Sequence, residues 1–110
     1  MPNVKIYADE TVARDRGEAL RAALPGLRDL LCAGLHVGIE ACQIALLPVA
    51  GLADQPLVNV ELLILPNADR DAATIRAVAT GIRERLAEAS GVHVAVRVSM
   101  LDPATYLALK

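Results

Sequence analysis

The sequence predicts an α/β (α+β) fold in which two β-α-β units form one four-stranded mixed sheet with two helices on one face. Three observations predict this fold. The chain has 110 residues, the size of a single domain, residues 1–110. Two long amphipathic stretches each lie between short apolar stretches. Each such crossover joins two parallel strands, and crossovers of this kind are right-handed.

The first β-α-β unit consists of a strand, a helix and a second strand, and it ends near Gly51. Residues 3–8 alternate polar and apolar side chains, which is typical of a strand with one buried face. Leucines at three- and four-residue spacing over 11–35 predict an amphipathic helix. Proline removes a helix hydrogen bond, so we expect a kink at Pro25, or two helices of which the second begins at Pro25. Residues 42–49 form the second strand.

The second unit repeats this order. Residues 57–65 are almost wholly apolar and predict the third strand. The turn at 66–69 supplies a cap for a helix over 69–89. Its apolar stripe consists of Ile75, Val78, Ala79, Ile82 and Leu86. Ser90 and Gly91 end the helix, and residues 92–101 form the fourth strand. We expect the first and third strands to be antiparallel at the centre of the sheet, with the second and fourth outside.

The face of the sheet away from the helices has a mixed character. Its polar residues are Asn3, Lys5, Tyr7, Gln43, Asn59, Glu61, His93, Arg97 and Ser99. Such a face is suited to water or to other copies of the chain, and Lys5, Glu61 and Arg97 are placed to pair across strands.

Composition narrows the class of protein. Apolar residues make up 55% of the chain, an excess that predicts burial between subunits. The net charge of −2, the absence of a basic block and the presence of only two aromatic residues argue against nucleic-acid binding. No apolar run approaches the ~20 residues of a membrane helix. The start has no signal-peptide pattern, so we expect a cytoplasmic protein. Cys32 and Cys42 lack metal-ligand spacing and are expected to be small buried hydrophobic residues.

Pro2 is the residue most informative about function, because it stands after Met1 at the head of the first strand. Removal of Met1 makes its nitrogen a secondary amine. A free α-amine has a pKa of about 8, and burial lowers the pKa of an amine. A buried amino-terminal proline can therefore be neutral near pH 7 and act as a general base. Proline also occurs at position 2 without any such role.

Pro2 at the strand head, the two crossover units, and the apolar strand 57–65 with its following helix give the chain its resemblance to the tautomerase superfamily. Within it the layout is most similar to the group of 5-carboxymethyl-2-hydroxymuconate isomerase and macrophage migration inhibitory factor. The resemblance implies a homotrimer and catalysis by Pro2. It also implies a small acidic or keto-acid substrate, whose proton is moved to give keto–enol or double-bond isomerisation, and no metal or organic cofactor.

The resemblance also indicates where the substrate binds. Many relatives hold the substrate carboxylate with an early arginine and one on the second strand, where this chain has Gln43. The candidate arginines here are Arg14, Arg16 and Arg97, because a bidentate arginine is the natural partner of a carboxylate. Tyr7 is a candidate proton donor to a developing enolate. Tyr106 either closes a pocket or anchors the tail.

Three functions stay open on the sequence. The first is a small trimeric isomerase with Pro2 as general base. The second is an oligomeric binding or scaffold protein with the same fold and no catalysis. The third is a related proline-dependent dehalogenase or decarboxylase acting on a small acid.

Overall fold

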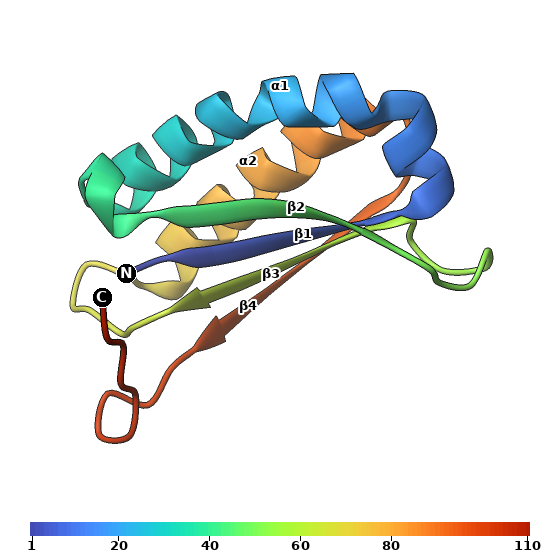
Figure 1. The fold of residues 1–110 in the computed structure, drawn as a ribbon. Helices are drawn as coiled ribbons and strands as arrows, with labels where there is room; N and C mark the ends of the chain where they lie inside the picture. The colour runs from blue at the N-terminus through green and yellow to red at the C-terminus, as the bar shows by residue number, and fades with distance from the viewer.

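The computed structural model describes residues 1–110 and contains four strands and two long helices (Figure 1). Their bounds are β1 Asn3–Asp9, α1 Glu10–Leu35, β2 Gln43–Val49, β3 Val58–Ile64, α2 Ala72–Ser90 and β4 Val94–Met100. A short 3₁₀ helix, η1 Ile39–Ala41, precedes β2. The strand order is β2-β1-β3-β4, with β1 and β3 antiparallel and each parallel to its outer neighbour. The predicted fold class and strand arrangement are confirmed.

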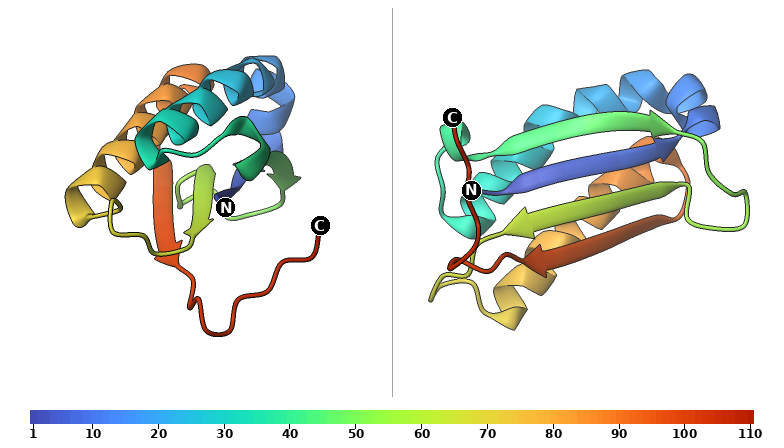
Figure 2. Two further views of the ribbon diagram at one scale, coloured as in Figure 1. Left: turned by 90° about the vertical axis from the view of Figure 1, so that its left-hand side faces the viewer. Right: turned by 60° about the horizontal axis from the view of Figure 1, so that its bottom comes forward.

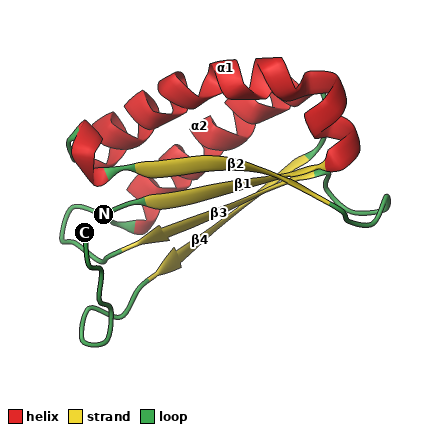
Figure 3. Ribbon diagram, viewed as in Figure 1, coloured by secondary structure: helices red, strands yellow, loops and turns green.

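Both helices lie on one face of the sheet, and no element covers the other face (Figures 2 and 3). The core lies between the two layers. The sheet contributes Val4, Ile6, Ala8, Val58, Val60, Leu62, Ile64 and Val94 to it. The helices contribute Val12, Leu20, Leu27, Leu31, Leu35, Val78, Ile82 and Leu86. Burial of each such Leu, Ile or Val side chain contributes roughly 1.5–3 kcal/mol. The fold is therefore stabilised mainly by apolar packing between the two helices and the face of the sheet that they cover.

The bend in α1 lies at a different residue from the one expected. Pro25 lies inside the helix, whereas Arg16 has non-helical angles (φ −127°, ψ 15°). The first turns consequently run at an angle to the rest of α1 (Figure 1). The expectation that two helices meet at Pro25 was wrong, because the helix continues through it and the one departure from helical angles is at Arg16. The bend falls beside Gly17, where a residue without a side chain lets the helix axis change direction.

The start of α2 also differs from the prediction. The helix begins at Ala72 instead of residue 69, because the carboxylate of Asp71 accepts the backbone N–H of Thr74 at 2.8 Å and caps the helix there. Asn67 instead accepts the N–H of Asp69 within the preceding turn. Neither helix has the combination of length and apolar character that a membrane-crossing segment requires.

The two β-α-β units are related by an approximate twofold axis between β1 and β3. The register pairs Asn3 with Leu63 and Ala8 with Val58, so the strands start at opposite ends of the sheet. The residues before β1 and before β3 therefore lie in different surroundings, at opposite ends of the sheet. Pro2 precedes β1 at one end, and Pro56 precedes β3 at the other.

Candidate active site

Pro2 lies between the start of β2 and the end of β3. Its side chain is buried, and its carbonyl oxygen accepts the backbone N–H of Gln43 at 2.9 Å. The register, which pairs Asn3 with Gln43 and with Leu63, places Pro2 beside Cys42 on one side and Ile64 on the other. The central position of β1 in the sheet therefore fixes Pro2 from both flanks.

A cavity of about 280 Å³ opens beside Pro2. Its lining includes Met1, Asn3, Glu40, Cys42, Gln43, Tyr106 and Lys110. The last two belong to the tail that follows β4. The N–H of Leu101 donates to the carbonyl of Ile64 at 2.8 Å, and the tail then runs back past the start of β1 (Figure 2). The cavity is thus formed by chain segments that are far apart in the sequence.

The electrostatics at this end of the sheet disfavour a protonated amine. Burial lowers the pKa of the Met1 amino group below its usual 8.0, and the charges of Arg70 and Lys110 lower it further. The thiol of Cys42 opposes this shift weakly. The same cations favour a bound anion.

Arg70 lies close enough to the amino terminus to lower the pKa of the Met1 amine, although it does not line the Pro2 cavity. One of its terminal nitrogens, Nη1, donates to the carbonyl of Leu65 at 2.5 Å. Leu65 follows β3, and the antiparallel register places it beside Met1. The Nε of Arg70 is buried and has no hydrogen-bond partner; the one other side-chain atom in this state is Nε of Arg28. Arg28 in turn lowers the pKa of the Cys42 thiol. Both arginines with unused donors therefore flank the Pro2 end of the sheet.

Arg70 is not among the arginines predicted from the sequence, although its position carries a signal. It follows the turn after the third strand, and an antiparallel pairing with the first strand brings that turn to Pro2.

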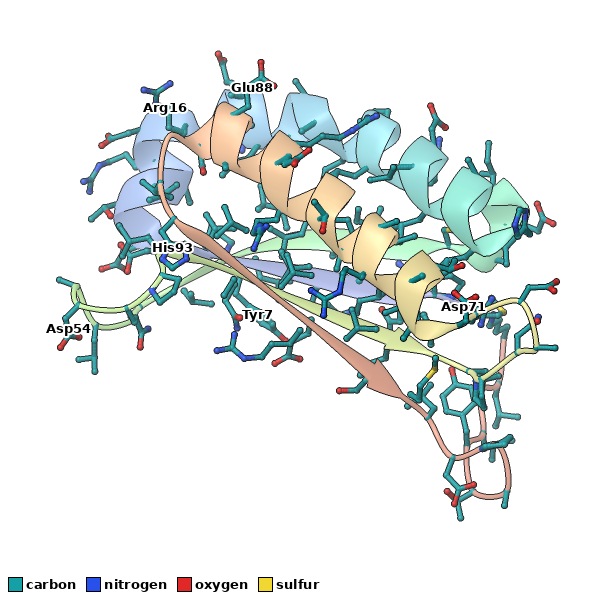
Figure 4. The ribbon with its side chains drawn as sticks, turned by 180° about the vertical axis from the view of Figure 1, so that it is seen from behind. Tyr7, Arg16, Asp54, Asp71, Glu88 and His93 are labelled. Atoms are coloured by element: carbon teal, nitrogen blue, oxygen red, sulfur yellow. The ribbon has the colours of Figure 1, made fainter.

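The structure brings only part of the predicted site together within one subunit. Pro2 and Gln43 line the same cavity. Tyr7 lies on the uncovered face, further along β1 (Figure 4). Arg14 and Arg16 lie in the first turns of α1, beyond the far end of β1, where Arg14 contacts Asp15 at 3.5 Å.

Arg97 lies on the uncovered face of β4, where it donates to the side chain of Asn59. Lys5 donates to Asn3 at 2.8 Å, and Arg14–Asp15 is the one ion pair of the chain. The expected ionic pairing among Lys5, Glu61 and Arg97 is therefore not formed. Amide side chains hold both cations instead.

A second cavity, of about 270 Å³, lies at the opposite end of the sheet. It is lined by Tyr7, Asp9, Pro56, Asn59 and Glu61 among others, with no lysine or arginine. Its two carboxylates make it unsuited to an acidic ligand. The Pro2 cavity is lined by one cation, Lys110, and one carboxylate, Glu40. A larger cavity of about 720 Å³ between α2 and β4 is lined by three arginines and a histidine and by no carboxylate, so its charges also suit an anion.

Solved structures share this fold over nearly the whole chain. A domain of unknown function (DUF1904) from Sebaldella termitidis is 19% identical, with a TM-score of 0.73, and the match covers 98% of this chain and 95% of that one. A fused 4-OT, an asymmetric trimer, is 15% identical with a TM-score of 0.74, over 96% and 91% of the two chains. A member of the cis-3-chloroacrylic acid dehalogenase family is 16% identical with a TM-score of 0.68, and the match covers 96% of this chain and 79% of that one.

The chain has the tautomerase fold. The fused 4-OT, the dehalogenase relative and a similar macrophage migration inhibitory factor-like protein from Entamoeba histolytica are all tautomerase-superfamily proteins. The predicted resemblance is confirmed at the level of fold. The sequence matches no protein-family model and no curated protein.

Proposed function

We propose that the chain is a tautomerase-type isomerase that moves a proton on a small unsaturated or keto acid, with Pro2 as the general base once Met1 has been removed. One observation carries the proposal. Pro2 is buried at the head of the central strand, beside a cavity where burial and two cations lower the pKa of an amine.

The chemistry follows from this position. With Met1 gone, the nitrogen of Pro2 is a secondary amine in the surroundings that depress the pKa of the Met1 amine. A neutral amine at pH 7 removes a proton from the carbon next to a carbonyl group. The resulting enolate gains stability from the nearby positive charges. Return of the proton to another carbon completes the isomerisation, and the amine is neutral again.

Arg70 and Lys110 are the proposed carboxylate-binding groups. Arg70 lies outside the cavity lining and its Nε is buried, so its side chain would have to rotate to bring a charge-assisted hydrogen bond to the carboxylate. Lys110 lines the cavity directly. Gln43 and Tyr106 line it as well and provide neutral hydrogen-bonding groups. Within a homotrimer, Arg97, Arg14, Arg16 and Tyr7 would reach such a cavity only from a neighbouring subunit. The assembly of the fused 4-OT relative as a trimer supports this arrangement.

The test compares two forms of the protein that differ only at the amine. The first is produced without an amino-terminal tag, and its intact mass establishes whether Met1 has been removed. The second carries an uncleavable amino-terminal extension, which converts the Pro2 nitrogen to an amide and leaves every side chain in place. Both are assayed with phenolic pyruvates and unsaturated diacids, and circular dichroism checks their fold.

The proposal expects turnover only in the form with a free Pro2 amine, and loss of that turnover in Pro2→Ala. Equal turnover in the extended form would exclude Pro2 as the base. Retention of Met1 in the untagged protein would do the same.

A second candidate is an oligomeric binding or scaffold protein without catalysis. The uncovered face of the sheet supports it, because half-buried Leu63 and Ala95 lie there among polar groups. Sedimentation analysis combined with absence of turnover across the substrate panel would favour this candidate. Turnover restricted to halogenated or decarboxylating acids would instead favour a dehalogenase or decarboxylase.

A further inference from the structure

The two cysteines lie together beside the Pro2 end of the sheet. Cys32 is in the last turns of α1, and Cys42 immediately precedes β2. Their sulfur atoms are 3.4 Å apart, and both side chains are only half-buried. This differs from the expectation of two separate buried hydrophobic residues. The sequence gives no sign of the contact, because it depends on how η1 returns the chain to the sheet.

We propose that Cys32 and Cys42 form a reversible disulfide that controls the cavity at Pro2. The disulfide itself depends only on the cysteine geometry. Its effect on turnover rests on the function proposed above.

The geometry requires a small movement. A disulfide has an S–S distance of about 2.05 Å, so the two sulfurs must approach by about 1.3 Å. The connection between them includes four exposed residues, His36, Gly38, Ile39 and Glu40. An exposed connection of this kind absorbs such a shift at lower cost than either packed element.

The chemistry requires an oxidant, for which a low-molecular-weight disulfide such as oxidised glutathione suffices. The Cys32 thiolate attacks this disulfide and releases one glutathione thiol, leaving a mixed disulfide on Cys32. The Cys42 thiolate then attacks the Cys32 sulfur and releases the second glutathione thiol. Two protein thiols lose two electrons and two protons, and one glutathione disulfide becomes two thiols.

The order of attack follows from the surroundings of Cys42. Burial and the contact with Cys32 raise the pKa of the Cys42 thiol to about 11, which keeps it protonated at neutral pH. We therefore assign the first attack to Cys32. Once Cys32 is in a mixed disulfide, its hydrogen bond and charge no longer oppose ionisation of Cys42. The guanidinium of Arg28 favours the Cys42 thiolate as it forms.

The link to Pro2 is direct. Cys42 lines the Pro2 cavity, and the next residue, Gln43, donates its backbone N–H to the Pro2 carbonyl. Closing the disulfide moves Cys42, the last residue of the connection, toward α1, and this disturbs the hydrogen bond made by the adjoining Gln43 N–H. A displacement of about 1 Å at a catalytic group is enough to lower turnover by about a hundredfold. We expect a loss of about ten- to a hundredfold in the oxidised protein, restored by reduction.

The experiment equilibrates the full chain over a series of reduced-to-oxidised glutathione ratios. Intact mass and thiol titration give the state of the cysteines, and the amide resonance of Gln43 reports on the Pro2 contact. The expected product has the mass of one chain less two hydrogens, with no disulfide between chains, and its Gln43 resonance is shifted. Glutathione adducts, or disulfides between chains only, would overturn the proposal, as would thiols that stay free across the series.

Two serine variants keep the outcome interpretable. Cys42→Ser is expected to accumulate the glutathione adduct on Cys32, whereas Cys32→Ser is expected to react more slowly. Cys32→Ser also serves as the control for turnover, because Cys32 does not line the cavity. Its turnover should be unaffected by the oxidant. An unshifted Gln43 resonance in the oxidised chain would refute control of the cavity even if no substrate is known. If the reduced protein shows no turnover but oxidation still shifts the Gln43 resonance, the isomerase proposal is contradicted and the disulfide proposal is not.

Discussion

Replacement of Gly34 by alanine tests the contact between the two helices, on which the position of both β-α-β units depends. Gly34 lies in α1, and a Cβ atom added to it would be 2.5 Å from Cγ2 of Val78 on α2. Val78 is only 3% exposed, so its methyl group has little room to retreat. Alanine is favoured over glycine within a helix by about 1 kcal/mol. Overpacking of a well-packed core costs about 1–3 kcal/mol.

The balance predicts that Gly34→Ala lowers the free energy of unfolding by about 1 kcal/mol, which lowers Tm by about 4 °C in a domain of this size. Gly26→Ala is the matched control on the same helix. Its new Cβ would meet only the far end of the Arg85 side chain, at 3.0 Å. We expect this variant to gain about 0.5–1 kcal/mol from helix propensity, less the contribution of the exposed hydrogen bond from Arg85 Nη1 to the Gly26 carbonyl if that bond is lost.

Urea and thermal unfolding at one fixed protein concentration measure both variants. Combining Gly34→Ala with Val78→Ala removes the methyl group that the new Cβ meets, and in that background Gly34→Ala should become stabilising. If Gly34→Ala alone is as stable as Gly26→Ala, the close contact between Gly34 and Val78 does not exist.

Three further predictions concern the site and the helix cap. Arg70→Gln should lower kcat/KM for a carboxylate substrate by about ten- to a hundredfold, because a charge-assisted hydrogen bond contributes about 1.5–3 kcal/mol; unchanged kcat/KM would remove Arg70 from the site. The kcat/KM of the wild type should rise with pH as the Pro2 amine loses its proton, with a midpoint below the ordinary pKa of a free amine, because the surroundings lower the pKa of the Met1 amine. Arg70→Gln should move that midpoint upward, since the guanidinium lowers the pKa of the nearby amine, and a pH–rate profile measures both. Asp71→Ala should lower Tm at neutral pH, because hydrogen bonds from Thr74 hold the pKa of the Asp71 carboxyl below its ordinary value. This stabilisation is present above the ordinary pKa of the carboxyl and is lost as the pH falls through the lowered pKa. The difference in Tm between wild type and Asp71→Ala should therefore vanish in acid.

The sheet could be predicted because its signals are local. Alternation along residues 3–8 and the apolar run 57–65 each identify a strand, and two crossovers between four strands leave few topologies. The stripe of the second helix placed Val78, Ile82 and Leu86 in the core, where the structure has them.

The bend of α1 and the charged groups of the site could not be predicted in the same way. Proline has the stronger local reason to bend a helix, yet the bend falls beside Gly17, where the change of direction carries the first turns toward the end of β1. Arginines were sought where the resemblance places them. Arg70 reaches the site through a turn whose conformation depends on its hydrogen bond to Leu65, a contact that exists only after the sheet has formed.

The approximate twofold relation of the two units has a consequence for how many reactive centres one chain can hold. Pro56 stands at the head of β3 much as Pro2 stands at the head of β1, and each borders a cavity of similar size. Pro56 follows Gln55 in mid-chain, so its nitrogen is permanently acylated and has no lone pair available as a base. Doubling the β-α-β unit therefore doubles the scaffold but not the number of amines. A base of the kind proposed for Pro2 can therefore form at one of the two cavities only.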